Sequence, residues 1–555
     1  MGGASSTGQP ATGTAAPAPK PGGIYRTLQD EDLASFDPLE ARTAITNTIA
    51  GFAYSRLLKF KMGEGRLADG TLEADAVTKW EQPDETTILL RLRDSMKFEQ
   101  RSPTNGRTLT TEDVVLSWEK FAASAAYRGD LAQSANPSAP ITSFQASDAN
   151  QIMIKTAYPD AQLLPSMNFW GGLWILPKEG LTGGFEPATT MRGSGPWILE
   201  QHQASVGFSF KKNPNYYGVP GQPLLDGVEV PIITDAAQAS AQFKAKNLHG
   251  GSPSAVPTTD IVAFYRDLKG TRIDMEAPPV GGPTISFSWR ENNPYRDKRV
   301  RQAMSMLIDR DAYIDLFYDL KNFQSADVEM RAYWNTPLSA GWGPFWLDPK
   351  SDAFGSNGKY LKRDVGEAKK LLAAAGYADG FETPFTYVAG SNYGRDWGQR
   401  AEALMAMLGE GGIRCQANAI DYRSVWIPSY LRNHGDFDGM AMYPNGSRGD
   451  PGQWLHVFFT STGANNQVAK NFPALDDLVT QQRQELDRAK RIAIVHEIQR
   501  YFAGEMPTIP QGGNTELAAL SWNGLHGPEL YFRWEAGPAG AEAYPKYWLD
   551  DSLRR

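Results

Sequence analysis

The segment from Thr284 to Asp311 constrains the fold more than any other part of the chain. Polar and apolar residues alternate over Thr284–Trp289, a pattern that predicts a strand. Asp297 ends the following loop and can cap a helix by accepting backbone N–H bonds. Helical spacing of apolar residues follows, at Val300, Ala303, Met304, Leu307 and Ile308. The segment therefore predicts a strand, a short loop and a capped helix with one buried face.

Length and charge limit the class of protein. The chain has 555 residues, of which 41% are hydrophobic. A single core stops growing near ~250–300 residues, so we expect two or more lobes. The net charge is −8 and the isoelectric point is about 5.5, which excludes a basic nucleic-acid footprint. No stretch approaches the ~20 apolar residues of a membrane-spanning helix.

Cysteine and histidine usage bears on metals and catalysis. Cys415 is the single cysteine, which excludes an intramolecular disulfide and a cysteine-rich zinc site. The six histidines are scattered and form no H-x-x-x-H pair. The chain also lacks a G-x-S-x-G elbow and a phosphate-binding P-loop, which weighs against common hydrolases and NTPases. We therefore predict no cofactor, no metal site and no catalytic residues.

Further blocks predict an α/β chain. Thr110 can cap a helix in which Val114, Val115, Trp118 and Phe121 supply a buried stripe. Asp364 opens another helix, and Gly376 closes it. A strand at 386–390, a helix at 401–408 and a strand at 413–420 then alternate, which suits an α/β lobe. A last long helix is expected at about 487–502.

These blocks, in order, resemble the extracytoplasmic solute-binding proteins of ABC importers, family 5, the oligopeptide, dipeptide and nickel-binding type. The family phrase N-x-P-F/Y-x-D matches Asn293–Asp297, and R-V-R-Q-A-x-x-x-A-I-D-R matches the helix ending at Arg310. L-T-A-E-D-V-V resembles Leu109–Val115, and G-T-G-P-Y resembles Gly193–Trp197. The resemblance covers roughly residues 24–530.

The resemblance implies a fold and its divisions. The fold would be α/β, a two-lobed periplasmic-binding-protein-like fold (type II, cluster C) with an extra third domain. Lobe I would take residues 24–71, 190–283 and 512–555, the extra domain 72–189, and lobe III 284–511. The two lobes would close on a ligand at a hinge.

The first 23 residues form a separate region. Residues 2–23 contain only Gly, Ala, Ser, Thr, Pro, Gln and Lys, so they cannot build a core and should behave as a disordered tether. Binding lipoproteins resemble this arrangement, and we expect that Met1 replaces a lipidated Cys. An ordinary disordered tail is the alternative. The resemblance thus implies an extracytoplasmic location, in the periplasm or at the outer face of the cytoplasmic membrane.

A solute cleft needs aromatic walls and a few fixed polar groups. The chain carries 15 tryptophans, several of them in Gly- and Pro-containing loops. Loop context and family position favour Trp170, Trp342, Tyr393 and Trp397 as ligand-binding residues, and Tyr54 and Trp289 complete the aromatic set. Core packing is the alternative for any one of these aromatic side chains.

The segment Tyr443–Pro451 is the predicted polar part of the cleft. Asp450-Pro451 resembles the D/E-P step of the family's cleft loop. In the family's oligopeptide binders an Asp three places earlier pairs with the peptide amine, and here that place holds Ser447. The missing carboxylate puts recognition of an α-amine in doubt. Arg448 could instead bind a carboxylate or hydroxyls, with a solvated loop arginine as the alternative. Tyr443 and Asn445 complete the predicted site.

The resulting functional hypothesis is a monomeric receptor. It captures a peptide or similar small polar solute and delivers it to an ABC permease in the membrane. An oligosaccharide or opine receptor of the same fold is the alternative. A cleft glycosidase using two carboxylates such as Asp438 and Asp450, or a chaperone or signalling receptor, is a further one.

Overall fold

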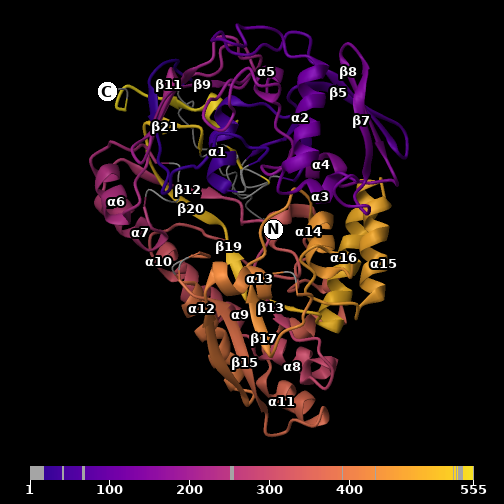
Figure 1. Cartoon of the computed structure of the whole chain (residues 1–555). Coiled ribbons are helices and arrows are strands. Elements are labelled where there is room, and N and C mark those ends of the chain that lie inside the picture. Colours follow the sequence, from indigo (N-terminus) through magenta and orange to yellow (C-terminus); the bar gives the residue numbers. More distant parts are fainter. Residues whose placement is uncertain are drawn as a thin grey trace, which may run out of the picture.

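The computed structural model describes residues 18–553 except 41–42, 65–68, 251–255, 391, 395, 432, 529–530, 533 and 535–541. Most of the predicted tether, residues 1–17, therefore lies outside the described part. The molecule has a broad upper part and a tapering lower part (Figure 1). No described helix has the length and apolar content needed to cross a membrane.

Lobe I, in the upper part, is built on a four-stranded sheet. Its order is β1 (Ile24–Arg26), β11 (Gly227–Pro231), β10 (Gly207–Lys212) and β9 (Trp197–Gln203), with β1 parallel to β11. A second pair, β12 (Thr271–Glu276) with β20 (Leu517–Trp522), brings the end of the chain back to this lobe. Its helices are α1 (Ala44–Ala53), α6 (Ala236–Lys244) and α7 (Thr258–Asp267).

Short strand pairs complete this lobe. They are β2 (Leu58–Phe60) with β4 (Leu72–Ala74), β3 (Gly63–Glu64) with β22 (Tyr531–Phe532), and β21 (Leu525–His526) with β23 (Trp548–Leu549). The two ends of the described chain meet beside the lobe, where the Lys20 ammonium lies 3.0 Å from the Asp551 carboxylate.

The extra domain has an antiparallel sheet of its own. Its order is β5 (Val77–Asp84), β6 (Thr87–Leu92), β8 (Gln151–Thr156) and β7 (Ile141–Asp148). Helix α2 (Thr111–Ser124) buries Val114, Trp118 and Phe121 as predicted and leaves Val115 half-buried. The Asp113 carboxylate accepts a bond from the Thr110 N–H at 2.8 Å. The short helices are α3 (Arg128–Leu131), α4 (Leu163–Asn168) and α5 (Lys178–Leu181).

Lobe III forms the tapering lower part, around a five-stranded mixed sheet. The order is β16 (Ile413–Ile420), β15 (Phe381–Val388), β17 (Met440–Tyr443), β13 (Thr284–Phe287) and β18 (Ile509–Pro510). Strands β15, β16 and β17 are parallel, and β13 is antiparallel to its neighbours. The α-helices are α8 (Lys298–Leu307), α9 (Arg310–Tyr318), α10 (Leu320–Gln324), α11 (Val365–Ala374), α12 (Trp397–Gly409), α13 (Ile427–Ser429), α14 (Pro451–Phe459), α15 (Pro473–Gln484) and α16 (Arg488–Glu505).

The strand, loop and helix predicted at 284–311 are present, but α8 is buried at every residue from Val300 to Leu307 and not on one face alone. The Asp297 carboxylate accepts the Arg299 N–H at 2.8 Å and so caps α8. Strand β13 ends at Phe287 rather than Trp289, and all four of its residues are buried. Its polar side chains Thr284 and Ser286 do not face solvent, because both hydroxyls donate to the Gln467 amide oxygen.

The buried apolar side chains of the described residues fall into two clusters. One combines lobe I with the extra domain, for example Phe52 with Trp174 and Leu176. The other belongs to lobe III, and Phe60, Phe169, Val280 and Trp534 join it from outside. The chain passes between the lobes at 277–283 and again at 511–516, where β19 (Gly513–Thr515) pairs with β14 (Ala332–Trp334). The residue boundaries of the domains stay a prediction.

Candidate ligand-binding cleft

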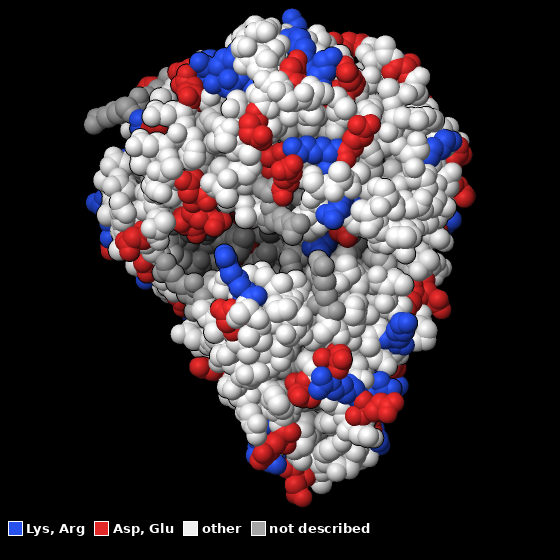
Figure 2. Space-filling model, in the orientation of Figure 1, with Lys and Arg blue, Asp and Glu red and all other residues white. Residues whose placement is uncertain are grey.

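A hollow lies between the broad upper part and the tapering lower part, at the left and centre of the face shown in Figure 2. The segment that follows β17 leads from the middle of the lobe III sheet toward lobe I and the extra domain. It ends at Asp450, whose carboxylate caps α14 by accepting the Gly452 N–H at 2.7 Å. The predicted D-P step thus fixes the end of this segment, residues 444–450, which we call the cleft loop.

Two predicted site residues meet across the domain boundary. Trp170 follows α4 in the extra domain, and its indole Nε1 donates to the Ser447 hydroxyl of the cleft loop at 3.1 Å. Both residues are half-buried. The Trp170 ring stands edge-on to Tyr127 and Phe169, with centroids 5.7 and 5.6 Å away. An aromatic wall and a hydroxyl therefore lie side by side, contributed by two different parts of the chain.

Arg448 is buried beside this pair. Its guanidinium lies over the rings of Tyr127 and Phe458, 5.1 and 5.2 Å from their centroids. Nη1 donates to the Ser447 carbonyl at 3.0 Å, and Nε lies 3.7 Å from the Asp130 carboxylate. Only 7% of the residue is exposed, so the alternative of a solvated loop arginine is wrong.

Asp450 is held by a buried ion pair. Both of its carboxylate oxygens accept bonds from the Arg491 guanidinium, one of them at 3.0 Å. A cavity of about 120 Å³ adjoins the pair and is lined by residues from both sides of the boundary, among them Pro165, Phe345, Arg488 and Trp534. This role of Asp450 leaves its part in ligand binding a prediction.

The remaining polar and aromatic candidates of lobe III lie at or after the ends of strands β15 and β17. Asn445 donates to the Thr284 hydroxyl at 3.1 Å and accepts from the Gln467 amide at 2.6 Å. Tyr443 is buried, and its hydroxyl donates to the Tyr430 carbonyl at 2.6 Å. Tyr393 is half-buried and packs against the buried Trp397, with centroids 5.3 Å apart.

Three other aromatic candidates pack in the cores. Tyr54 is 2% exposed at the end of α1, and burial raises the pKa of its phenol well above the usual value. The Trp289 indole donates to the Gln467 carbonyl at 2.8 Å. Trp342 is fully buried against Trp534, with centroids 5.4 Å apart. In this conformation the core-packing alternative describes them, and a ligand contact stays a prediction.

A polar seam that the sequence reasoning missed joins the extra domain to lobe III. Asp160 accepts two bonds from Arg483 of α15, at 2.9 and 3.1 Å, and the Ala161 N–H donates to the Arg483 carbonyl at 2.8 Å. Asp130 accepts from the Gln453 amide at 3.0 Å. Figure 1 shows α14–α16 beside α3 and α4. No local pattern in the sequence pairs Asp130 or Asp160 with a partner 323 residues later in the chain.

Burial shapes the charges of this seam. It raises the pKa of the Asp130 and Asp160 carboxyls, and the Arg448 and Arg483 guanidiniums oppose that shift. The carboxylate forms are therefore held in place by their arginine partners rather than by water. The name seam is used below for Asp130, Asp160, Arg448, Gln453 and Arg483.

Two histidines predict how stability depends on pH. Burial, assisted by a nearby arginine, lowers the pKa of His249 and of His456 to about 4. In the folded chain both imidazoles stay neutral to about pH 4, whereas in the unfolded chain they take up protons below about pH 6.5. The unfolded chain binds more protons in that window, so stability is complete above pH 6.5 and falls as the pH drops toward 4.

The test is urea unfolding at pH 7, 6, 5 and 4. His249→Gln should flatten the pH dependence by on the order of 2–3 kcal/mol over the window, while His434→Gln, on the exposed loop after α13, should leave it unchanged. The Asp130 and Asp160 carboxyls have raised pKa values, so their contribution to stability increases as the pH falls. An identical slope in wild type and His249→Gln would contradict the assignment.

Comparison with known proteins gives a consistent result. A family model described as "Bacterial extracellular solute-binding proteins, family 5 Middle" matches residues 71–466. The chain is 24% identical over 458 residues to the nickel-binding protein NikA of Staphylococcus aureus, covering 81% of this chain and 82% of that protein. It is 25% identical to the dipeptide-binding protein of Escherichia coli, with 82% of each covered.

The fold is shared with solved structures. The periplasmic binding protein DppA of Helicobacter pylori, in complex with the peptide STSA, superposes with a TM-score of 0.70 at 20% identity, covering 96% of this chain and 99% of that one. This likeness confirms the two-lobed fold predicted from the sequence. Because the family model covers well over half of its length, the chain belongs to the bacterial extracellular solute-binding proteins, family 5.

Proposed function

We propose that this protein captures a peptide or similar small polar solute between lobe III and the part formed by lobe I and the extra domain, and delivers it intact to an ABC permease. It would act outside the cytoplasm as a monomer, without turnover, with the N-terminal segment serving as a lipid-anchored tether. Family membership supports solute binding, and peptide-binding relatives favour a peptide-type solute. The two separate cores and the two chain crossings make a hinge motion available.

The contact between Trp170 and Ser447 carries the proposal. It places an aromatic face and a fixed polar group from opposite domains within one hydrogen bond of each other. A cleft of this composition binds small solutes by stacking and by a few directional bonds. Ser447 offers no carboxylate where family peptide binders carry one, so the α-amine of a ligand should not be the main recognition point. This favours an opine or oligosaccharide as the alternative solute.

Mass spectrometry tests the proposal directly. The protein is purified without refolding and then denatured, and small molecules released from it are identified. Calorimetry with that solute, and with peptides in free and N-acetylated form, follows. We expect an intact solute and equal affinity for the free and acetylated forms. Recovery of a cleaved product would contradict the proposal that the protein binds its solute without turnover. Loss of binding on acetylation would show that an acidic group other than residue 447 binds the α-amine.

Arg448→Ala should weaken solute binding. The guanidinium holds the cleft loop through two main-chain carbonyls and could contribute a charged hydrogen bond to the ligand. We expect a loss of about 1.5–3 kcal/mol in binding free energy, the scale of a hydrogen bond to a charged group. Isothermal titration calorimetry measures it, with Arg299→Ala, an exposed arginine paired to Asp297, as control. Equal affinities in the two variants would contradict this role.

A further inference from the structure

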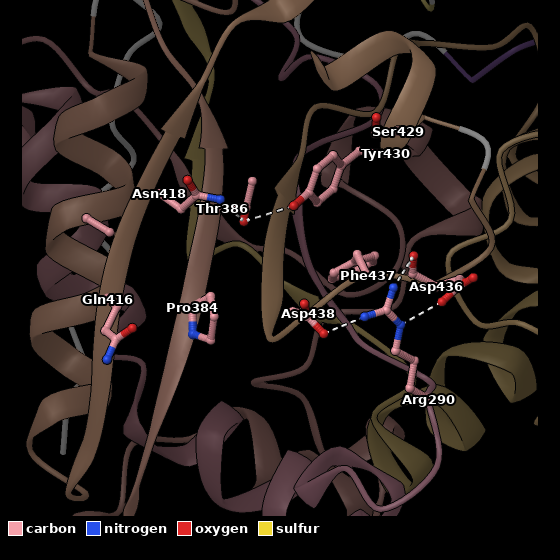
Figure 3. Close-up of a pocket in the computed structure, with 11 residues that line it drawn as sticks. Arg290, Pro384, Thr386, Gln416, Asn418, Ser429, Tyr430, Asp436, Phe437 and Asp438 are labelled. Atoms are coloured by element: carbon pink, nitrogen blue, oxygen red, sulfur yellow. Dashed lines mark hydrogen bonds and ion pairs between the residues drawn. The ribbon is translucent and has the colours of Figure 1, made fainter.

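The described residues that line a second pocket all belong to lobe III, and none of them is in the cleft loop. It has a volume of about 520 Å³, within the usual range of ~300–1,000 Å³ for small-molecule sites. Figure 3 shows it between strands β15 and β16 on one side and Ser429, Tyr430 and Asp436–Asp438 on the other. Its described lining comes from lobe III alone, so occupation would not require closure of the lobes.

One wall is a polar face of the sheet. Pro384 and Thr386 are two residues apart on β15, and Gln416 and Asn418 are two apart on β16, so each pair faces the same side. The parallel register places Pro384 beside Gln416 and Thr386 beside Asn418. The Asn418 amide donates to the Thr386 hydroxyl at 3.0 Å, which fixes the orientation of the amide. Because β16 is an edge strand, its two amides are exposed.

The opposite wall is aromatic and rigid. The Tyr430 ring stacks on Trp426, with centroids 5.3 Å apart and planes at 3°. Phe437 is buried 5.4 Å from Tyr430. The Tyr430 hydroxyl reaches across to the Thr386 hydroxyl at 3.4 Å, as the dashed line in Figure 3 shows. The pocket therefore sets a fixed ring face opposite fixed hydrogen-bonding groups.

The charges of the pocket compensate one another. Arg290 donates to the Asp436 carboxylate at 2.6 Å and to the Asp438 carboxylate at 2.5 Å (Figure 3). One cation between two carboxylates leaves a single net negative charge, so an anion finds no unpaired positive partner here. The largely polar lining equally disfavours a purely apolar ligand.

We propose that this pocket binds a saccharide of one or two rings. Every sugar hydroxyl both donates and accepts, which matches amide and carboxylate side chains, and the C–H face of the ring packs on aromatic rings such as Tyr430. A volume of about 520 Å³ accommodates a disaccharide. This function is additional to solute capture in the cleft. The saccharide is either a free sugar or a chain end of a cell-envelope glycan.

The experiment uses the full chain and four soluble probes: maltose, cellobiose, trehalose and N,N′-diacetylchitobiose. Saturation-transfer NMR reports binding, and purified peptidoglycan in a sedimentation assay represents the polymeric source. We expect signal with at least one probe or sedimentation with the polymer, and at least a fivefold loss in Gln416→Ala/Asn418→Ala. Both changed residues are exposed, so folding should be preserved. Tyr430→Phe, which removes one hydroxyl, provides a second and milder variant.

Two controls locate the binding. Gln82→Ala/Gln145→Ala removes two exposed amides from the sheet of the extra domain and should change nothing. Ser447→Trp fills the cleft beside Trp170 and should leave saccharide binding intact. Soluble signal supports a free sugar, and sedimentation alone supports an envelope glycan. Loss in Ser447→Trp with retention in Gln416→Ala/Asn418→Ala would place the sugar in the cleft and overturn the proposal, as would no binding to any probe. Neither failure affects solute capture in the cleft.

Discussion

Asp450→Ala is expected to destabilise the protein by about 3–5 kcal/mol, the cost of leaving a buried charge without its partner. The side chains of Asp450 and Arg491 are only 4% and 6% exposed, and both carboxylate oxygens bond to the guanidinium. The substitution would also remove the cap of α14. Urea unfolding followed by tryptophan fluorescence measures the free energy of unfolding.

Asp315→Ala is the matched control, because that carboxylate forms an exposed pair with Lys321 at 3.1 Å. Exposed pairs contribute about 0–1 kcal/mol, so the control should unfold nearly as wild type does. Asp450→Asn keeps an acceptor for the cap and should fall between the two. A loss below about 1 kcal/mol in Asp450→Ala would show that Arg491 finds another partner or water, against the packing described here.

The second large effect is expected where the extra domain meets lobe III. Asp160→Asn should weaken the seam, because the Arg483 guanidinium, 11% exposed, would lose its charged partner. Removing one member of such a buried pair costs about 3–5 kcal/mol. The substitution would destabilise the state in which the extra domain is packed against lobe III. We therefore expect a larger radius of gyration in small-angle scattering and weaker solute binding.

A double-mutant cycle with Arg483→Met isolates the interaction itself. Asp160→Asn/Arg483→Met removes both charges, and coupling within one buried network is about 0.5–3 kcal/mol. The double variant should therefore be more compact than Asp160→Asn alone. Wild-type scattering should also show a smaller radius with saturating solute than without it. Equal radii in all four proteins would mean that the seam does not control the separation of the two parts.

Local structure was largely predictable, because it depends on neighbours in sequence. Asp297 and Asp364 cap the helices they were expected to cap, and Gly376 follows α11 with a φ of +93°. The strand predicted at 413–420 is confirmed residue for residue. The strand predicted at 386–390 instead spans Phe381–Val388, because its length is set by pairing with β16, which lies 32 residues later.

The candidate site was only partly predictable. The loop signature led to Ser447 and Arg448, and the aromatic pattern led to Trp170, all three of which lie at the domain boundary. The sequence around Trp342 is similar in composition to that around Trp170. Trp342 is nevertheless fully buried, because it packs against Trp534, which lies near the C-terminal end of the chain. Asp160 and Arg483 show the same limit, because nothing local relates a loop carboxylate to a helix in another domain.

The salt bridge between Lys20 and Asp551 has a mechanical consequence. The described ends of the chain are both attached to lobe I, and lobe III is reached only through the two crossings at 277–283 and 511–516. A pulling force applied through the N-terminal segment would load the β1–β11 pair and bypass those crossings. An anchor at that end would hold lobe I in place, and any motion of lobe III about the two crossings would be opposed by the seam rather than by the anchored segment.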